Sequence, residues 1–148
     1  MANKIKVTES MTYYPEVVFR NTLVKNALSV MKKYKIRHLP VVEKNKVVGI
    51  VSERDLKSKG KSNSTSVDDV MVANPYRVKR GQLLAAVAQK MAEKKYGCAV
   101  IEDDKGDVVG IFTTTDALFL LSRLLKDSEY AKLKLEQINW SRFPEYMI

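Results

Sequence analysis

The sequence predicts an α+β fold made of two strand-helix-strand-strand-helix repeats with approximate two-fold symmetry and a C-terminal helical tail. The main observation is a duplication: residues 47–55 read VVGIVSERD, and residues 108–116 read VVGIFTTTD. Met11 aligns with Met71, and matches continue through each copy at an offset of about sixty residues. Because a unit of that size buries little surface alone, we expect the two copies to share one core.

In the first copy, a short extended piece at residues 16–19 precedes a helix. Asn21 or Thr22 is placed to cap that helix, and apolar side chains recur at helical spacing. These are Leu23, Ala27, Val30, Met31 and Tyr34. Two Val-rich strands at residues 39–43 and 47–52 follow as a hairpin, and a second helix starts near Glu53.

The second copy has the same order. Residues 76–79 form the extended piece, residues 82–95 form the helix, and Gly97 acts as its stop signal. The hairpin strands are residues 99–102 and 108–113, and the next helix starts near Thr114. We therefore assign residues 5–60 to the first repeat, 61–66 to a linker, 67–125 to the second repeat and 126–148 to a helical extension.

The net charge of +9 is concentrated at the start of the chain. Residues 1–61 contain 14 basic and 5 acidic side chains, whereas the remainder contains 12 of each. Such a surface attracts phosphorylated ligands, nucleic acid or acidic proteins. A lysine-rich surface that only keeps the protein in solution is the alternative.

Composition also limits the class of protein. No apolar run approaches the length of a membrane span, and the start of the chain lacks a signal-peptide core, so we expect a cytoplasmic protein with no membrane partner. Cys98 is the single cysteine and cannot form an internal disulfide. One histidine and one cysteine give no catalytic triad and no zinc site, so we expect no enzyme activity and no bound metal.

The ordered motifs, present twice, resemble a pair of CBS (cystathionine-beta-synthase-type) domains, a tandem called a Bateman module. The stretches that carry the resemblance are MTYYPEVV, TLVKNALSVMKKYKIRHLPVVE and VVGIVSERDL, then DDVMVANPYRV, LLAAVAQKMAEKKYGCAVIED and VVGIFTTTDAL. The resemblance covers about residues 5–125. It implies a regulatory module that needs no cofactor and binds AMP, ADP, ATP or S-adenosylmethionine in clefts between the repeats.

The resemblance also implies a ribose clamp in each copy, formed by Ser52 with Asp55 and by Thr113 with Asp116. A carboxylate accepts two hydrogen bonds from a vicinal diol, and the start of a helix holds it in place. A Ser or Thr before a helix with an acid three residues later is also a capping box, which needs no ligand.

The segment before the third strand of each copy is the second candidate site. In related modules these positions line the base and phosphate pocket, which here implicates Ile36, Arg37, His38 and Pro40. The second copy has Tyr96, Gly97, Cys98 and Val100 instead, so its cleft loses phosphate partners unless Lys95 or Arg80 reaches across. Arg54 is a further candidate for phosphate contact. We expect unequal sites, with the first-copy cleft binding the phosphorylated ligand.

The apolar helix at residues 116–125 predicts a partner surface. Similar modules pair through helices into homodimers, and this helix is the candidate interface. Residues 126–148 include Trp140. Three roles remain open for this segment: a dimer arm, a lid over the cleft or a docking peptide for a target protein. Regulation then acts on a separate effector protein, and the alternative functions are nucleic-acid binding or purely structural dimerisation.

Overall fold

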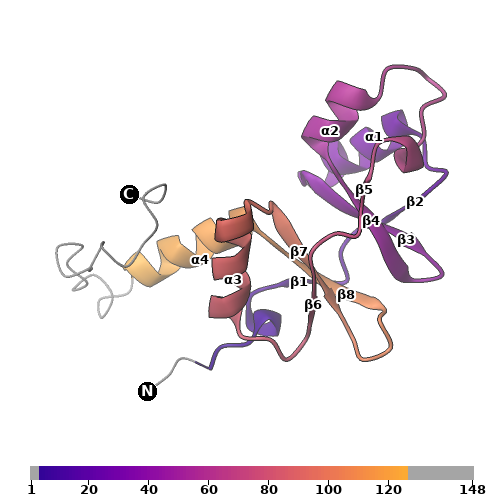
Figure 1. Cartoon of the computed structure of the whole chain (residues 1–148). Coiled ribbons are helices and arrows are strands. Elements are labelled where there is room, and N and C mark those ends of the chain that lie inside the picture. The colour runs from indigo at the N-terminus through magenta and orange to yellow at the C-terminus, as the bar shows by residue number, and fades with distance from the viewer. Residues whose placement is uncertain (1–3, 127–148) are drawn as a thin grey trace.

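The structure is a computed structural model that describes residues 4–126. Two four-stranded mixed sheets, each with two helices, form two lobes (Figure 1). The first lobe contains β2 (Val18–Phe19), α1 (Val24–Tyr34), β3 (His38–Glu43), β4 (Lys46–Ser52) and α2 (Glu53–Lys59). The second contains β6 (Arg77–Lys79), α3 (Leu84–Lys94), β7 (Cys98–Glu102), β8 (Val108–Thr113) and α4 (Thr114–Lys126). The predicted α+β class and the element order of the two repeats are confirmed. The predicted helical extension at residues 126–148 lies, beyond Lys126, outside the described residues.

Each lobe has the same strand pairing. β2 is parallel to β3, and β6 is parallel to β7, whereas the hairpins β3–β4 and β7–β8 are antiparallel. The helix between the parallel strands is the crossover that such pairing requires. The hairpin then leads directly into the following helix, α2 or α4.

Two short strands cross between the lobes. β1 (Thr12–Tyr13) begins the first copy but pairs with β8, and β5 (Val72–Ala73) begins the second copy but pairs with β4. The sequence pattern did not predict this exchange. As a result each four-stranded sheet contains strands from both copies.

The cores follow the same exchange. Val7 and Met11 pack into the core under α3, while Val67 and Val70 pack into the core under α1. A third apolar cluster joins the lobes and consists of Val42, Val47, Val100 and Val108. The hairpin turns add a polar link, since the Lys46 ammonium donates to the Asp107 carboxylate and to the Lys105 carbonyl. The repeats are therefore held together by exchanged strands and a shared apolar layer.

Two helix boundaries differ from the sequence prediction. Leu23 occupies the N-cap position of α1 without a side-chain cap, because the Thr22 hydroxyl accepts from the Phe19 amide instead. At the end of α3, Lys95 takes the left-handed conformation with φ 57°, as Lys35 does after α1 with φ 54°. Gly97 therefore does not stop the helix, and its role is explained by its neighbours in the cleft.

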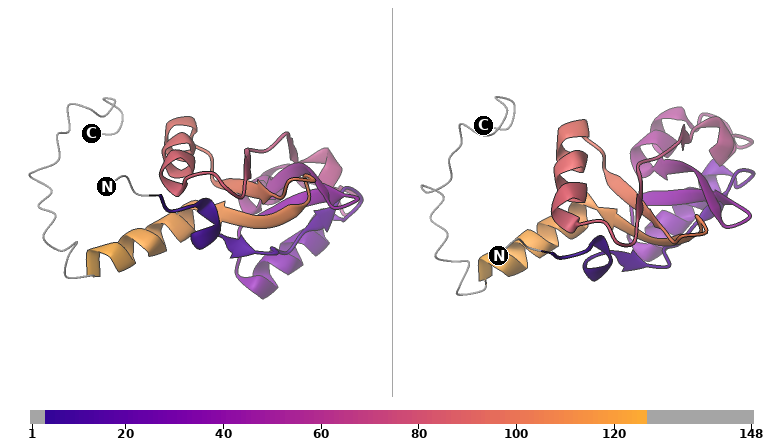
Figure 2. Two further views of the ribbon diagram at one scale, coloured as in Figure 1. Left: turned by 90° about the horizontal axis from the view of Figure 1, so that it is seen from below. Right: turned by 60° about the horizontal axis from the view of Figure 1, so that its bottom comes forward.

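The last described helix, α4, extends beyond the lobes in both views of Figure 2. Its apolar residues Leu118, Phe119, Leu121 and Leu125 are at least half exposed. Ala117 and Leu120 on its other side pack against the core of the second lobe. No helix within residues 4–126 combines the length and apolar character needed to cross a bilayer.

Candidate functional site

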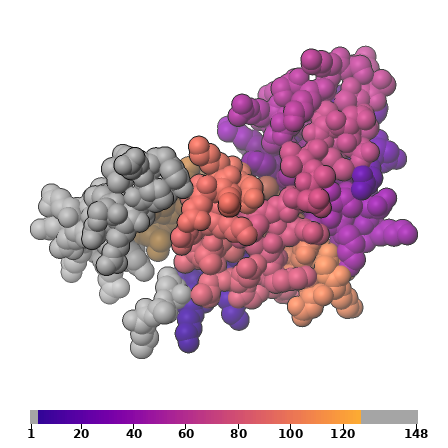
Figure 3. Space-filling view, in the orientation of Figure 1, coloured from indigo at the N-terminus to yellow at the C-terminus, as the bar shows by residue number. Residues whose placement is uncertain are grey.

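A cleft of about 1180 Å³ lies between the two lobes. The first lobe supplies the start of β3, the end of β4 and α2, and the second supplies residues 74–77, α3 and residues 95–98. The space-filling view shows this recess between α3 and the first lobe (Figure 3). The volume is sufficient for a nucleotide-sized molecule.

Ser52 and Asp55 stand at this cleft. The Ser52 hydroxyl donates to Oδ2 of Asp55 at 3.0 Å and accepts from the Asp55 amide at 3.1 Å. Lys59 lies 3.4 Å from the other carboxylate oxygen, and the Asp55 side chain is 28% exposed. The pair caps α2, yet its carboxylate remains accessible and keeps acceptor positions for ligand hydroxyls.

Thr113 and Asp116 form a more complete capping box. Oδ2 of Asp116 accepts from both the amide and the hydroxyl of Thr113 at 2.8 Å, and the hydroxyl accepts from the Asp116 amide. Neither residue lines the cleft or the smaller groove described below. The duplicated motif thus caps a helix in both repeats, but only the first copy faces the cleft.

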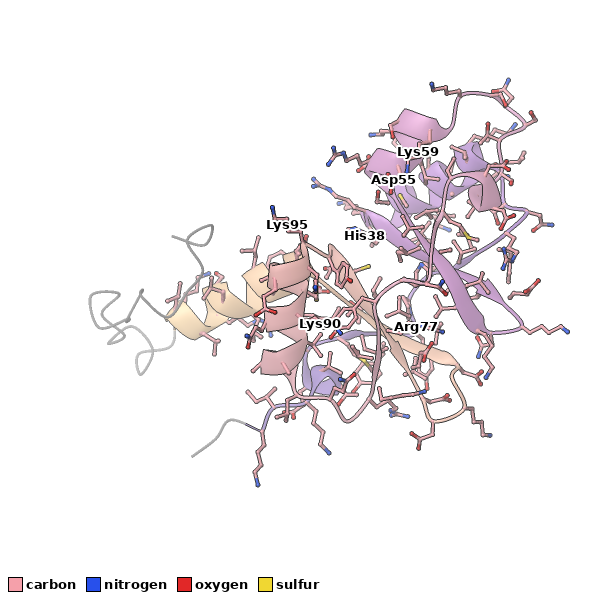
Figure 4. The ribbon with its side chains drawn as sticks, viewed as in Figure 1. His38, Asp55, Lys59, Arg77, Lys90 and Lys95 are labelled. Carbon is pink, nitrogen blue, oxygen red and sulfur yellow. The ribbon has the colours of Figure 1, made fainter. Side chains whose placement is uncertain are left out.

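His38 lies at the centre of the site, between the residues of the two walls (Figure 4). It pairs with Ser52 across the β3–β4 hairpin. Burial lowers the pKa of His38, the Arg37 charge acts in the same direction, and the nearby Asp55 carboxylate opposes them. Neutral imidazole is therefore favoured at neutral pH, with a donor and an acceptor nitrogen.

Gly97 faces this imidazole from the opposite repeat. A Cβ atom at position 97 would lie 2.7 Å from Nε2 of His38, which is closer than real contacts allow. Cys98 follows in β7, and burial raises the pKa of its thiol to about 12. Its sulfur is therefore a neutral, apolar part of the wall.

Two tyrosines form the aromatic part of the cleft. The rings of Tyr76 and Tyr96 are 5.3 Å apart at 31°, and Nζ of Lys90 lies 5.0 Å from the Tyr76 ring centre. Burial, and secondarily the neighbouring Tyr96, raises the pKa of Tyr76, so the phenol stays neutral. Neutral rings of this kind offer a stacking surface for a planar base.

The structure brings together most of the residues that the sequence singled out. Those that line the cleft are Arg37, His38, Ser52, Arg54, Asp55, Tyr96, Gly97 and Cys98. Pro40 is fully buried, and Ile36 lines a smaller groove of about 430 Å³ between α1 and α2. Lys95 reaches the cleft, whereas Arg80 is not among its lining residues.

Sequence reasoning missed several of the residues that enter from the second repeat. Asn74, Tyr76, Arg77 and Lys90 line the cleft, and Asn74 has a left-handed φ of 52°. The sixty-residue offset gives no signal for Asn74 and Tyr76, because they align with Tyr14 and Glu16, which are not candidate site residues of the first copy. Within residues 4–126, no cluster of His, Cys, Asp or Glu is suited to hold a metal ion.

Comparison with known families explains this duplicated architecture. The model of the CBS domain matches residues 5–61 and again residues 67–123. The chain belongs to the CBS domain family. Its two matched segments form a tandem pair, or Bateman module, and the exchanged strands β1 and β5 lie inside those segments.

Two known proteins with similar sequences are much longer than this chain. Inosine-5'-monophosphate dehydrogenase of Aquifex aeolicus is 35% identical over 117 residues, which make up 76% of this chain and 24% of that enzyme. L-aspartate semialdehyde sulfurtransferase of Methanocaldococcus jannaschii is 27% identical over 111 residues, covering 74% of this chain and 22% of the sulfurtransferase. The chain thus spans about a quarter of the length of these two relatives.

Solved structures cover the CBS pair almost completely. CBSX2 of Arabidopsis thaliana, in complex with AMP, is 27% identical with a TM-score of 0.70, over 80% of this chain and 97% of that one. The CBS domain pair of protein MJ0100, in complex with 5'-methylthioadenosine and S-adenosyl-L-methionine, is 26% identical with a TM-score of 0.73. That match covers 78% of this chain and 98% of that one.

Proposed function

We propose that this CBS pair is a non-catalytic regulatory module that binds an adenosine-containing ligand in the cleft between its repeats. The observation that carries the proposal is the position of Asp55, whose partly exposed carboxylate opens into a cleft lined from both repeats. The ligands of CBSX2 and of the MJ0100 pair support the same class, since AMP, 5'-methylthioadenosine and S-adenosylmethionine all contain adenosine.

Each part of the ligand has a matching part of the cleft. The Asp55 carboxylate accepts from the ribose hydroxyls, with the Ser52 hydroxyl holding it in place. Adenine stacks on the Tyr76 and Tyr96 pair. Because the ligand contacts both repeats, its binding favours the arrangement in which they are drawn together, by as much as it prefers that state.

Isothermal titration calorimetry of the full chain with AMP, ADP, ATP and S-adenosylmethionine tests the proposal. We expect saturable binding of at least one of these ligands. Silence toward all four would remove the proposed function. Retention of arbitrary RNA or DNA, lost as salt is raised, would then favour the alternative of phosphate binding through the basic first repeat.

We also propose that the module pairs with a second copy through α4 and signals to a separate effector protein. The observation is the run of exposed apolar side chains on this projecting helix, including Leu118 at 66% and Phe119 at 62% exposure. Sedimentation analysis of the double variant Leu118→Ser, Phe119→Ser is expected to show a shift toward monomer. A species of unchanged mass would exclude these two side chains from the interface.

A further inference from the structure

We infer that the ligand of this cleft carries a chain of phosphates, so that a nucleoside triphosphate binds better than a monophosphate or a sulfonium nucleoside. The inference rests on the proposed function and specifies its ligand class. It starts from the charge of the cleft, which contains seven lysine and arginine side chains against two carboxylates. The cations are Arg37, Arg54, Lys57, Lys59, Arg77, Lys90 and Lys95, and the carboxylates are Glu53 and Asp55.

The cations are divided between the two walls. Arg54, Lys57 and Lys59 belong to α2 of the first repeat, whereas Lys90 belongs to α3 and Lys95 follows it in the second repeat. Figure 4 shows Lys59 on one side of His38 and the pair Lys90 and Lys95 on the other. A single phosphate is the more compact anion and presents its oxygens around one phosphorus atom. A chain of phosphates presents charged oxygens along its length, which suits cations distributed over two walls.

Several of these cations already have acidic partners. Lys57 binds Glu53 at 2.5 Å, and Lys59 lies 3.4 Å from Asp55. Arg77 lies 3.6 Å from the nearly buried Glu102 carboxylate, outside the cleft. Because a carboxylate lies beside each of these three cations, their positive charge is largely balanced before a ligand binds.

Three cleft cations remain without a carboxylate at ion-pair distance in the described part of the chain. They are Arg54 on the first wall and Lys90 and Lys95 on the second. Arg37 adds a fourth, weakly held one, since it is 4.0 Å from Glu53 with its side chain 82% exposed. This surplus is the electrostatic complement of a ligand with several negative charges.

Lys90 is the most informative of these cations. The face of Tyr76 holds its ammonium group 5.0 Å from the ring centre without neutralising it. A terminal phosphate carries close to two negative charges near pH 7, and each further phosphate in a chain adds charge. S-adenosylmethionine instead brings a positive sulfonium group next to these cations. The cleft therefore favours the polyphosphate over the sulfonium ligand.

Calorimetric titration of the full chain with adenosine, AMP, ADP, ATP, S-adenosylmethionine and inorganic tripolyphosphate, at constant ionic strength, tests this order. We expect affinity to rise with each phosphate, with ATP at least about tenfold tighter than AMP because an added phosphate gains charge-assisted hydrogen bonds. Lys90→Met and Lys95→Met are expected to reduce the ATP-to-AMP ratio and leave adenosine affinity nearly unchanged.

Lys33→Met is the matched control. Lys33 lies 5.1 Å from the Tyr34 ring centre, almost the geometry of Lys90 on Tyr76, but it does not line the cleft. Its removal loses an equivalent cation–π contact and is expected to leave the ratio unchanged. A ratio lowered equally by Lys33→Met and Lys90→Met would overturn the inference.

The outcomes separate this inference from the proposed function. If AMP or S-adenosylmethionine binds at least as tightly as ATP, the polyphosphate inference fails and the adenosine-binding function stands. If tripolyphosphate binds as tightly as ATP, the inference stands and recognition of adenosine fails. If none of the compounds binds, both fail.

Discussion

A side chain on Gly97 would collide with the imidazole of His38: its Cβ atom would lie 2.7 Å from Nε2 of that ring. His38 begins β3 in the first repeat, and Gly97 precedes β7 in the second, so this contact joins equivalent segments of the two repeats. Position 97 is equivalent to Arg37, where the first copy carries a large side chain. The absence of a side chain at Gly97 therefore leaves the space that the His38 ring occupies between the two walls.

Gly97→Ala is expected to displace the His38 ring and to lower the free energy of unfolding by about 1 kcal/mol, as crowding at a packed contact does. In urea unfolding, the double variant Gly97→Ala, His38→Ala is expected to lose less stability than the sum of the two single variants, because removing the imidazole relieves the collision. Gly81→Ala is the control, because a Cβ there meets nothing within 4 Å. Equal effects at positions 81 and 97 would contradict the contact.

His38 also predicts how stability depends on pH. Burial lowers its pKa from 6.5, so the unfolded chain takes up the proton at a higher pH than the folded chain. The folded state is therefore expected to lose stability as the pH falls below about 6.5, down to the lowered pKa of His38. Urea unfolding between pH 7.5 and pH 5.5 measures this loss.

The control for this prediction is His38→Gln, whose stability is expected to change less over the same range. Glu53 and Asp107 have pKa values lowered by hydrogen bonds from Lys57 and Lys46. Their contribution is lost only as the pH falls through the acidic range near and below about 4.5, outside this window. Wild-type stability that rises on acidification from pH 7.5 to 5.5 would contradict the assignment.

Cys98 is expected to resist alkylation although it lines the cleft. Burial raises the pKa of its thiol to about 12, and only the thiolate reacts. Against the ordinary thiol pKa of 9.0, the thiolate fraction at neutral pH is lower by about a thousandfold. Iodoacetamide labelling followed by mass spectrometry, with the urea-unfolded chain as control, measures this protection. Equal labelling rates in the two states would show that the thiol is open.

The exchanged strands predict an effect at a distance in the sequence. Met11 is buried in the core of the second lobe, and a Cβ on Gly110 would lie 2.3 Å from its sulfur. Met11→Ala is expected to cost about 2–4 kcal/mol, as other large-to-small core changes do. Hydrogen exchange is expected to increase first in β7 and β8, the strands of the second lobe.

Met71→Ala is the symmetric comparison, since a Cβ on Gly49 would lie 2.5 Å from the Met71 sulfur. That change is expected to raise exchange in β3 and β4 of the first lobe. If Met11→Ala instead raised hydrogen exchange first in β3 and β4, and Met71→Ala first in β7 and β8, the strand exchange would be wrong.

The sequence allowed prediction of the elements whose signals are local. The hairpin strands are rich in Val, and the helices α1 and α3 have apolar residues at helical spacing. Because the unit is duplicated, the assignment of elements in one copy supported the assignment in the other. β1 and β5 are two residues long and have no such pattern. Their pairing depends on which sheet edge is open in the folded molecule, and a local pattern contains no information on that.

The same distinction applies to the site. Arg37, His38, Ser52 and Asp55 lie close in the folded first repeat because the β3–β4 hairpin pairs His38 with Ser52. Lys90 and Tyr76 reach the cleft only because the second lobe stands opposite the first. The two hydroxyl-and-acid motifs look equivalent in sequence, and only the surrounding fold shows that Asp116 is outside the cleft.

The paired variants Asp55→Ala and Asp116→Ala test the central claim most directly. Both remove an acid from a helix cap, so both are expected to lose about 1 kcal/mol of stability. In equilibrium dialysis with labelled ATP, we predict that Asp55→Ala weakens binding by about 100-fold through the loss of charge-assisted hydrogen bonds to ribose. Asp116→Ala is predicted to bind as the wild type does. Unchanged affinity in Asp55→Ala, or an equal loss in both variants, would contradict a ligand site at the Ser52 and Asp55 pair.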